Sequence, residues 1–350
     1  MNLNSEIAAS KMIDSYWLEM RDESIFMTGG SGLFGRWFIN ALLAANRRLG
    51  TNIKVTILTR DPKAFLNKTP ELSQDNLVSL ITGDVTNFDF PSCKYSRIIH
   101  LATTSAAETF SGEDQLAKFH LLTKGTERIL QFASICGAKK LLFTSSGVAY
   151  GAYSDDIKYV PETYFGAPST TDVSSALGQG KRAAEFLCAY YAEKYNFNYV
   201  IARCFSFVGP GLPLGIHYAI GNFIKDALKS DALIVKGDGT QMRSYLYLGD
   251  LVIWILALLV HGKSGRIYNV GSDKAISILE LAHRVRDLIA PEKEVIVTGN
   301  KIHNVGNFDR KWYVPDISRA REELNLDDWT ALDSAILKTA DHYKTHQHDH

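Results

Sequence analysis

Short apolar runs alternate with longer amphipathic stretches along the first 205 residues of the chain. The runs predict strands at residues 24–27, 54–59, 77–82, 97–101, 140–145 and 199–205. Helices are predicted at 33–43, 114–136 and 178–195, the first of them from apolar side chains that recur at helical spacing. Strands that alternate with helices are typical of an α/β fold, so we expect a doubly wound parallel sheet. Residues 1–22 are predicted to form a leading helix or extension.

The pattern changes after Phe205, where residues 207–221 are rich in Gly and Pro. This change predicts that the chain leaves the sheet to build a smaller, discontinuous lobe, and that 245–260 and 266–271 return to the main domain. Residues 276–345 are predicted to be mostly helical, with one strand at Glu294 to Val297. The longest apolar run, Leu251 to Val260, is too short to cross a bilayer, which needs about 20 residues, and is predicted to be a buried helix.

The composition is that of an ordinary globular protein. Of 350 residues, 46% are hydrophobic and 22% charged, which excludes the disordered and fibrous classes. Lys and Arg together number 38, as do Asp and Glu, so a chain of zero net charge has no overall attraction to nucleic acid. The four cysteines form no C-x-x-C pair and the histidine-rich tail has no completing ligands, so we expect no metal site. The acidic N-terminus does not look like a signal peptide, and we expect a cytoplasmic protein without a membrane span.

A glycine-rich turn follows the first predicted strand. Residues 28–35 read Thr28, Gly29, Gly30, Ser31, Gly32, Leu33, Phe34 and Gly35, which fit both G-x-G-x-x-G and G-x-x-G-x-x-G spacings. Such glycines allow a tight turn and let the backbone approach a pyrophosphate at the N-terminus of the next helix. Because the motif lies between a strand and an amphipathic helix, it predicts a dinucleotide site rather than a merely structural turn.

The second strand should end beside the adenosine ribose of such a dinucleotide. An acid at this position favours NAD and an arginine favours NADP. Here Arg60 follows the strand and Asp61 precedes a proline, where it fits better as a helix cap. We therefore expect an NAD(P) cofactor with a slight preference for NADP. Asp84 and Val85, after the third strand, are candidates to lie beside the adenine, although Asp84 also fits an ordinary loop aspartate.

Several further motifs follow in the order of one known family. They are His100-Leu101-Ala102, Ser145 to Gly151 (SSGVAYG), Gly180 to Glu185 (GKRAAE), Arg203 to Pro210 (RCFSFVGP), Gly237 to Tyr245 (GDGTQMRSY), Asp250, and Tyr268 to Gly271 (YNVG). With the glycine turn, they resemble the extended short-chain dehydrogenase/reductase family, the epimerase/dehydratase group that acts on nucleotide sugars. The resemblance spans about residues 24–325. It implies a Rossmann fold, with an NAD(P)-binding domain at 23–206 plus about 245–272 and a substrate-binding lobe at 207–244 plus 273–345.

The resemblance also implies the chemistry of the site. Hydride moves to and from a sugar carbon, a tyrosine carries the proton, a lysine lowers the tyrosine pKa and holds the nicotinamide ribose, and a hydroxyl orients the reacting oxygen. Ser146 would be that hydroxyl and Lys181 that lysine, while Leu101 and Ala102 would lie beside the nicotinamide. The tyrosine is missing, because Leu177 stands four residues before Lys181. Tyr150 and Tyr164 are close in sequence but lack the one-turn spacing to Lys181, and Tyr150 fits a structural role better.

The substrate is expected to be a nucleotide-diphosphate sugar. By resemblance, Arg243 and Arg310 would bind the diphosphate, and Ser206 and Asn222 would line the cleft. Gly147-Val148 stands where dehydratases tend to carry Asp-Glu, which favours an epimerase, dehydrogenase or reductase over a dehydratase. Leu177 keeps a catalytically weak or silent nucleotide-binding homologue as the alternative. We also expect a homodimer.

Overall fold

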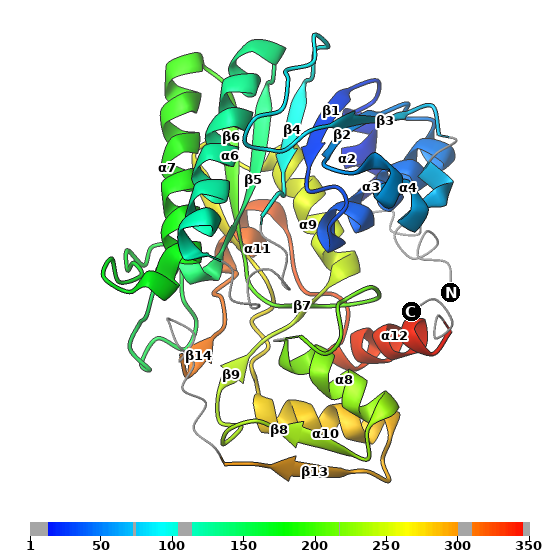
Figure 1. The fold of residues 1–350 in the computed structure, drawn as a ribbon, viewed down its shortest axis with the longest axis vertical. Coiled ribbons are helices and arrows are strands. Elements are labelled where there is room, and N and C mark those ends of the chain that lie inside the picture. Colours follow the sequence, from blue (N-terminus) through cyan, green and yellow to red (C-terminus); the bar gives the residue numbers. More distant parts are fainter. Residues whose placement is uncertain (1–12, 73–74, 104–113, 217, 300–309, 346–350) are drawn as a thin grey trace.

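The computed structural model describes residues 13–72, 75–103, 114–216, 218–299 and 310–345. In this part of the chain, seven parallel strands form one sheet in the order β11-β6-β5-β4-β1-β2-β3 (Figure 1). The strands are β1 (Ser24–Thr28), β2 (Lys54–Thr59), β3 (Val78–Thr82), β4 (Arg97–His100), β5 (Lys140–Ser146), β6 (Asn198–Cys204) and β11 (Arg266–Val270). The six predicted strands are all present, and the segment predicted to return forms the seventh, beside β6.

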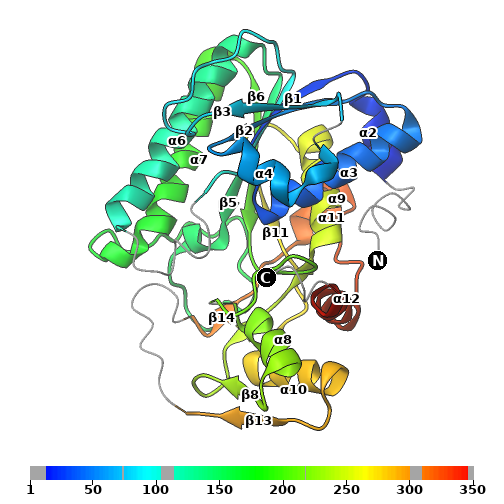
Figure 2. The ribbon, with the colours of Figure 1, turned by 45° about the vertical axis from the view of Figure 1, so that its right-hand side comes forward.

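Helices cover both faces of this sheet, so the predicted doubly wound α/β fold is confirmed (Figure 2). One face carries α6 (Gln115–Cys136) and α7 (Ala176–Tyr195). The other carries α2 (Asp14–Glu19), α3 (Leu33–Leu49), α4 (Pro62–Lys68), α9 (Leu248–His261) and α11 (Ser318–Leu324). The run from Leu251 to Val260 is the body of α9 and is almost wholly buried, as predicted.

Alternate residues of β1 belong to two different cores. Ile25 and Met27 pack in the cluster that includes α3 and α9, whereas Phe26 packs against Phe132 of α6 and other aromatic side chains. Successive side chains of a strand point to opposite faces, so a strand covered on both sides must be apolar throughout. This requirement explains why β1 reads as an uninterrupted apolar run.

The sheet reverses its direction of growth between β1 and β4. From β1 the chain proceeds outward through β2 and β3, then returns to build β4, β5 and β6 on the other side. In open α/β sheets, ligands bind beyond the carboxyl ends of the strands at such a switch point. The glycine turn after β1 and residues 101–102 after β4 lie at this position.

Among the described residues, the smaller lobe includes helices α8 and α10 and a pair of parallel strands. These are α8 (Ala219–Lys229), β8 (Ala232–Val235), α10 (Ile278–Ile289) and β13 (Glu294–Val297), and α12 (Leu332–Thr345) packs on both helices (Figure 1). The strand predicted at Glu294 to Val297 is confirmed, while β8 was not predicted. Ile220 of α8 and Leu281 of α10 belong to the same apolar core as Leu256 of α9, so the lobe is anchored to the main domain.

Short strands join the lobe to the sheet. They are β7 (Phe207–Val208), β9 (Met242–Arg243), β10 (Leu246–Tyr247), β12 (Ile276–Ser277) and β14 (Trp312–Tyr313). β9 lies between β12 and β14, with Arg243 paired in register to Ile276 on one side and Tyr313 on the other. Three segments distant in sequence therefore meet beneath the carboxyl ends of β5 and β6. The short 3-10 helices are η2 (Pro70–Leu72), η3 (Gly147–Tyr150) and η4 (Val173–Ser175).

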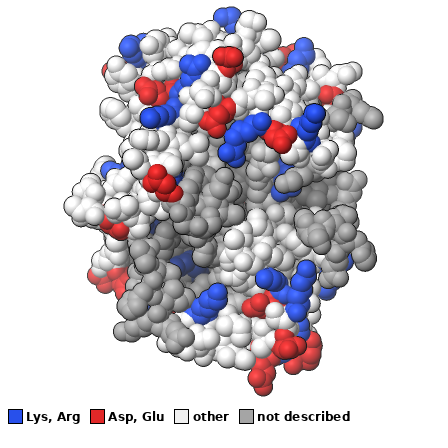
Figure 3. Space-filling model, in the orientation of Figure 1, with Lys and Arg blue, Asp and Glu red and all other residues white. Residues whose placement is uncertain are grey.

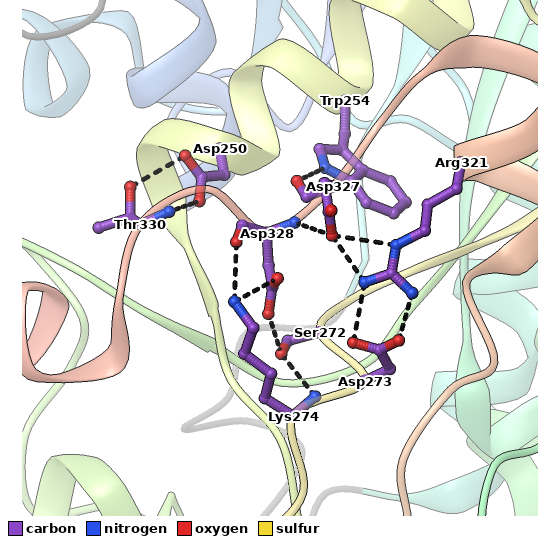
Figure 4. A network of polar contacts seen from close by, with 9 residues as sticks. All are labelled: Asp250, Trp254, Ser272, Asp273, Lys274, Arg321, Asp327, Asp328 and Thr330. Atoms are coloured by element: carbon purple, nitrogen blue, oxygen red, sulfur yellow. Dashed lines mark hydrogen bonds and ion pairs between the residues drawn. The ribbon is translucent and has the colours of Figure 1, made fainter.

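A polar network fixes the C-terminal segment to the main domain (Figure 4). Asp250 of α9 accepts hydrogen bonds from the backbone nitrogen and hydroxyl of Thr330 at 2.8 and 3.0 Å. Asp328 accepts from Ser272 and pairs with Lys274 Nζ at 2.8 Å. Arg321, Asp273, Asp327 and Trp254 complete the network. Asp250, named in the sequence motifs, thus ties α9 to the segment before α12. Burial raises the pKa of its carboxyl group to about 6.

Charged side chains of both signs are intermingled on the face of the molecule in Figure 3, as the zero net charge suggests. In the described ranges, every helix is too short or too polar to cross a bilayer. Those ranges also hold no cluster of three or more His, Cys, Asp or Glu side chains with metal-binding geometry.

Candidate active site

The glycine turn between β1 and α3 is packed too tightly for other residues. Gly29 has a φ of +71°, and a Cβ added there would lie 2.7 Å from the backbone nitrogen of Ala102. A Cβ at Gly35 would lie 2.4 Å from Gly30 Cα. At Gly32, by contrast, an added Cβ would meet only Gly29 O, at 3.2 Å, within the described residues. Gly29 and Gly35 are therefore required by packing, whereas Gly32 keeps the approach to the helix open.

Gly32 is the N-cap of α3, and no side chain caps this helix end. The amide groups of the first turn and the positive end of the helix dipole are thus available to an anion. Ser31 and Gly32 are exposed, and Leu33 is half-buried. A glycine cradle that a side chain would fill, in front of an uncapped helix, fits the pyrophosphate of a dinucleotide.

A buried histidine links the turn to its neighbours. His100, the last residue of β4, places Nδ1 2.7 Å from Thr28 Oγ1 and Nε2 3.0 Å from Thr126 Oγ1. The backbone nitrogen of Ala102 donates to Thr28 Oγ1 at 3.2 Å, and Leu101 is buried beside it. Burial, with a contribution from the charge of Lys181, lowers the pKa of His100 to about 3. The imidazole is therefore neutral and holds β1, β4 and α6 in register.

The residues expected near the adenosine lie at the ends of β2 and β3. Arg60 follows β2 and is exposed. Asp61 accepts a hydrogen bond from Ala64 N at 2.9 Å as the N-cap of α4, so its interpretation as a helix cap is confirmed. Asp84 accepts from the nitrogen and hydroxyl of Thr86, at 2.9 and 2.6 Å, which makes it part of a turn. Val85 lies against Gly125 of α6, where an added Cβ would approach its Cγ1 to 3.0 Å.

Ser146 and Lys181 are both held against β5. Ser146 ends this strand, and its hydroxyl accepts a hydrogen bond from Val148 N at 3.3 Å. Lys181 of α7 is buried, and its Nζ donates to Thr144 O at 2.7 Å. Burial lowers its pKa to about 8. Leu177 lies in the first turn of the same helix, one turn before Lys181, and is half-buried.

A buried ion pair stands behind these residues. Glu185 of α7 accepts from Arg203 Nε at 2.9 Å and Nη2 at 2.6 Å, and also from the Ser145 hydroxyl. The Arg203 guanidinium lies 4.3 Å from the centre of the Tyr150 ring. Both charged residues belong to the motifs recognised in the sequence, but their pairing was not predicted, because no local signal links residues on α7 and β6. The pair fixes α7, and with it Lys181, on the sheet.

The two tyrosines considered as substitutes for the missing phenol are engaged elsewhere. The Tyr150 hydroxyl donates to Asn269 Oδ1 at 2.7 Å, and burial raises its pKa. The Tyr164 hydroxyl donates to Ala152 O at 3.2 Å. Tyr150 therefore has the structural role expected of it, as a link between η3 and β11.

Two arginines meet next to Ser146. Arg310 is buried and donates from Nη1 to Gly147 O at 3.3 Å, while its buried Nε has no hydrogen-bond partner among the described residues. Arg243 donates from Nη1 to Met242 O at 2.8 Å and to Arg310 O at 3.1 Å. Burial lowers the pKa of both groups, and among the described residues neither forms a salt bridge with an acidic side chain. Among the described residues, the two desolvated cations donate hydrogen bonds to carbonyl oxygens and lie near tyrosine rings, so their charge is available to an anion.

The remaining candidates lie on the edge of the smaller lobe. Ser206 is half-buried between β6 and β7, and its carbonyl accepts from Leu246 N at 3.0 Å. Asn222 is half-buried in the second turn of α8.

Sequence reasoning missed Tyr313 of β14. Its ring packs on Phe205 with centroids 4.8 Å apart, and a Cβ added to Gly147 would lie 2.8 Å from its hydroxyl. Arg243 and Arg310 place their guanidinium carbons 5.9 and 5.6 Å from the ring centre. The only available signal was its position three residues after Arg310.

Comparison with known proteins agrees with this geometry. Residues 25–271 match the family model described as NAD dependent epimerase/dehydratase family. UDP-glucuronic acid decarboxylase 6 of Arabidopsis thaliana is 31% identical over 309 residues, which cover 86% of this chain and 82% of that protein. UDP-glucuronic acid decarboxylase 3 of the same plant is 30% identical over 304 residues, or 86% of this chain and 83% of that protein.

A solved structure of similar fold is UDP-glucuronic acid 4-epimerase from Bacillus cereus, in complex with UDP-glucuronic acid and NAD. Its TM-score is 0.77 at 22% identity, over 92% of this chain and 99% of that one. DesIV, a dTDP-glucose 4,6-dehydratase from Streptomyces venezuelae with NAD bound, gives 0.74 at 21% identity, over 93% and 98%. These likenesses support the fold, and the family match confirms the resemblance inferred from the motifs: the chain belongs to the NAD dependent epimerase/dehydratase family.

Proposed function

We propose that this protein binds NAD(P) at the glycine turn and modifies a nucleotide-diphosphate sugar by hydride transfer at a sugar carbon. Residues 28–35, 101–102 and Lys181 would hold the cofactor, which when bound accepts a hydride from the sugar and returns it. The lobe of residues 207–244 and 273–345 would supply the substrate contacts. The observation that carries the proposal is that buried Arg310 and half-buried Arg243 lie together next to Ser146 at the carboxyl edge of the sheet, and that neither pairs with an acidic side chain of the described residues.

We propose UDP-glucuronic acid as the first substrate to test, with reaction at C4 of the sugar. A uronic acid carries a carboxylate besides its diphosphate, so it offers two anionic groups to the two desolvated arginines. The decarboxylase and epimerase relatives are named for this substrate. Purified protein should be incubated with NAD and UDP-glucuronic acid, and the products separated by chromatography. An epimer, a pentose nucleotide or accumulated NADH supports the proposal, and unchanged substrate with no binding in calorimetry contradicts it.

A catalytically weak or silent nucleotide-binding homologue is the second candidate. Leu177 favours it, because leucine cannot carry a proton at the place where the family resemblance implies a tyrosine. The two candidates differ in turnover but not in binding. Calorimetric binding of UDP-glucuronic acid without any product after prolonged incubation would favour the silent homologue.

We propose a modest preference for NADP over NAD. Arg60 follows β2, and no acid ends this strand, so the position suits a 2′-phosphate better than a ribose hydroxyl. Dissociation constants for both cofactors should be measured on the parent protein and on Arg60→Ala. The substitution should weaken NADP binding and spare NAD binding. A parent that prefers NAD would contradict the assignment.

We propose a homodimer formed through α6 and α7. Large apolar side chains are exposed on both helices, among them Leu116 and Ile135 on α6 and Phe186 and Tyr190 on α7. Burial of such a surface against a second copy would remove it from water. Sedimentation should show a dimer for the parent and a monomer for Phe186→Glu. A monomeric parent would refute this proposal. The cytoplasmic location stays a prediction.

A further inference from the structure

The C-terminal segment brings a phenol to the residue that should orient the sugar oxygen. Tyr313 lies on β14, which pairs with β9 in parallel, so its position follows from a contact between the two distant strands. Its hydroxyl would lie 2.8 Å from a Cβ at Gly147, the residue that follows Ser146 in the chain. We propose that Tyr313 is a catalytic residue, which carries the proton that a phenol at position 177 would otherwise carry. This inference rests on the proposed hydride-transfer function.

The placement suits this role better than that of Tyr150 or Tyr164. A general acid must be within hydrogen-bonding reach of the oxygen it protonates, or reach it through one water. A phenol beside Gly147 is placed to reach the oxygen that the adjacent Ser146 would orient. Tyr150 and Tyr164 do not meet this condition, because their hydroxyls donate to Asn269 and to Ala152 O.

The ring is held in place and surrounded by positive charge. Stacking on Phe205 and pairing with β9 fix its position. Arg310 and Arg243 face it, and their charges lower the pKa of the phenol, as does the Ser146 hydroxyl, while Cys204 raises it. Burial is the largest influence, and the net effect raises the pKa above its usual value. The neutral phenol is the form that donates a proton in the reductive half of the cycle. In the oxidative half the group acts as the phenolate, which has released its proton to solvent and is stabilised by the two cations.

The step is a reduction of the sugar ketone. The C4 carbonyl carbon gains a hydride from the reduced cofactor, with its two electrons, and the carbonyl oxygen gains the phenolic proton of Tyr313. One O–H bond breaks on the tyrosine and one forms on the sugar, which leaves a phenolate and a sugar alcohol. In the reverse direction, the sugar hydroxyl returns its proton to the phenolate as the hydride leaves C4. An enzyme that oxidises and then reduces its substrate thus regenerates Tyr313 within each cycle.

The kinetic test compares Tyr313→Phe with a matched control. The variant keeps the ring stacked on Phe205 and removes only the hydroxyl. Tyr164→Phe makes the same change at a tyrosine whose hydroxyl donates to Ala152 O. With UDP-glucuronic acid and NAD, Tyr313→Phe should lower kcat about 10²–10⁴-fold, the range for a lost general acid, with KM changed much less. Tyr164→Phe should match the parent. Adding Leu177→Tyr to Tyr313→Phe should restore part of the lost turnover, because it returns a phenol to the helix position one turn before Lys181.

A binding measurement tests the contact without turnover. Calorimetry should compare UDP-glucuronic acid with its 4-deoxy-4-fluoro analogue on the parent and on Tyr313→Phe. For each protein, the dissociation constant of the analogue is divided by that of UDP-glucuronic acid. If the phenol contacts the C4 oxygen, this ratio should be about three- to tenfold larger for the parent than for Tyr313→Phe. Equal preference in the two proteins, or equal kcat, would overturn the assignment while the proposed function stands. A parent that binds the sugar without turning it over also overturns it. A parent that binds no nucleotide sugar overturns the proposed function itself.

Discussion

His100 should make the protein sensitive to mild acid, and this sensitivity can be calculated. The buried imidazole has a pKa of about 3 in the folded protein, against about 6.5 for an exposed histidine in the unfolded chain. Because the unfolded state binds the proton more readily, stability is lost as the pH falls below about 6.5. At pH 5 the unfolded side chain is protonated and the folded one is not. Because pH 5 lies about 1.5 units below the unfolded pKa of about 6.5, the free energy of unfolding should be about 2 kcal/mol lower at pH 5 than at pH 8.

The perturbation is His100→Gln, which keeps a polar side chain between Thr28 and Thr126 but cannot take up a proton in this range. Urea unfolding curves for the parent and the variant at pH 8 and pH 5 give the four free energies of unfolding. The parent should lose about 2 kcal/mol more than the variant between these pH values. Both proteins share every other titrating group, so the difference isolates His100.

Thr126→Val is the matched control for this experiment. It removes the hydroxyl that lies 3.0 Å from His100 Nε2 and leaves the buried histidine in place. This control should be less stable than the parent at both pH values and should keep most of the parent's loss toward pH 5. If His100→Gln loses as much stability toward pH 5 as the parent does, the histidine is not buried in its neutral form and the reasoning fails.

Three other substitutions test separate parts of the site. Gly32→Val should leave folding nearly intact, since an added Cβ meets only Gly29 O among the described residues. It should weaken cofactor binding in calorimetry, because the side chain blocks the approach of the pyrophosphate. An unchanged affinity would show that the turn is not part of the cofactor site. Arg243→Ala should weaken binding of UDP-glucuronic acid by about 1.5–3 kcal/mol and spare the cofactor, and equal substrate affinity would exclude a contact with the substrate. Glu185→Leu should lower the free energy of unfolding in urea by about 3–5 kcal/mol, because it leaves Arg203 buried without its partner. A loss under about 1 kcal/mol would show that water reaches the guanidinium.

The local features of the fold were predictable from the sequence alone. The central strands β1 and β5 contain short apolar runs, because a strand covered on both faces must be largely apolar, as β1 shows with Ile25, Phe26 and Met27. The glycine turn was predictable for a similar reason. Gly29 needs a positive φ and Gly35 has no room for a Cβ, and both requirements restrict the residue type at a fixed spacing. Ser146 and Lys181 were found because they lie in motifs of contiguous residues.

Only the tertiary structure decided how distant side chains are used. The pairing of β14 with β9 brings Tyr313 to Gly147, next to Ser146, and no periodicity near either residue records that proximity. The engagement of Tyr150 with Asn269, and of Glu185 with Arg203, likewise depends on packing between separate elements. Propensity and capping act within a few residues and so leave a pattern in the sequence, whereas a long-range contact exists only when the whole chain has folded. The absence of a tyrosine at position 177 could therefore be read from the sequence, but the presence of another phenol beside Ser146 could not.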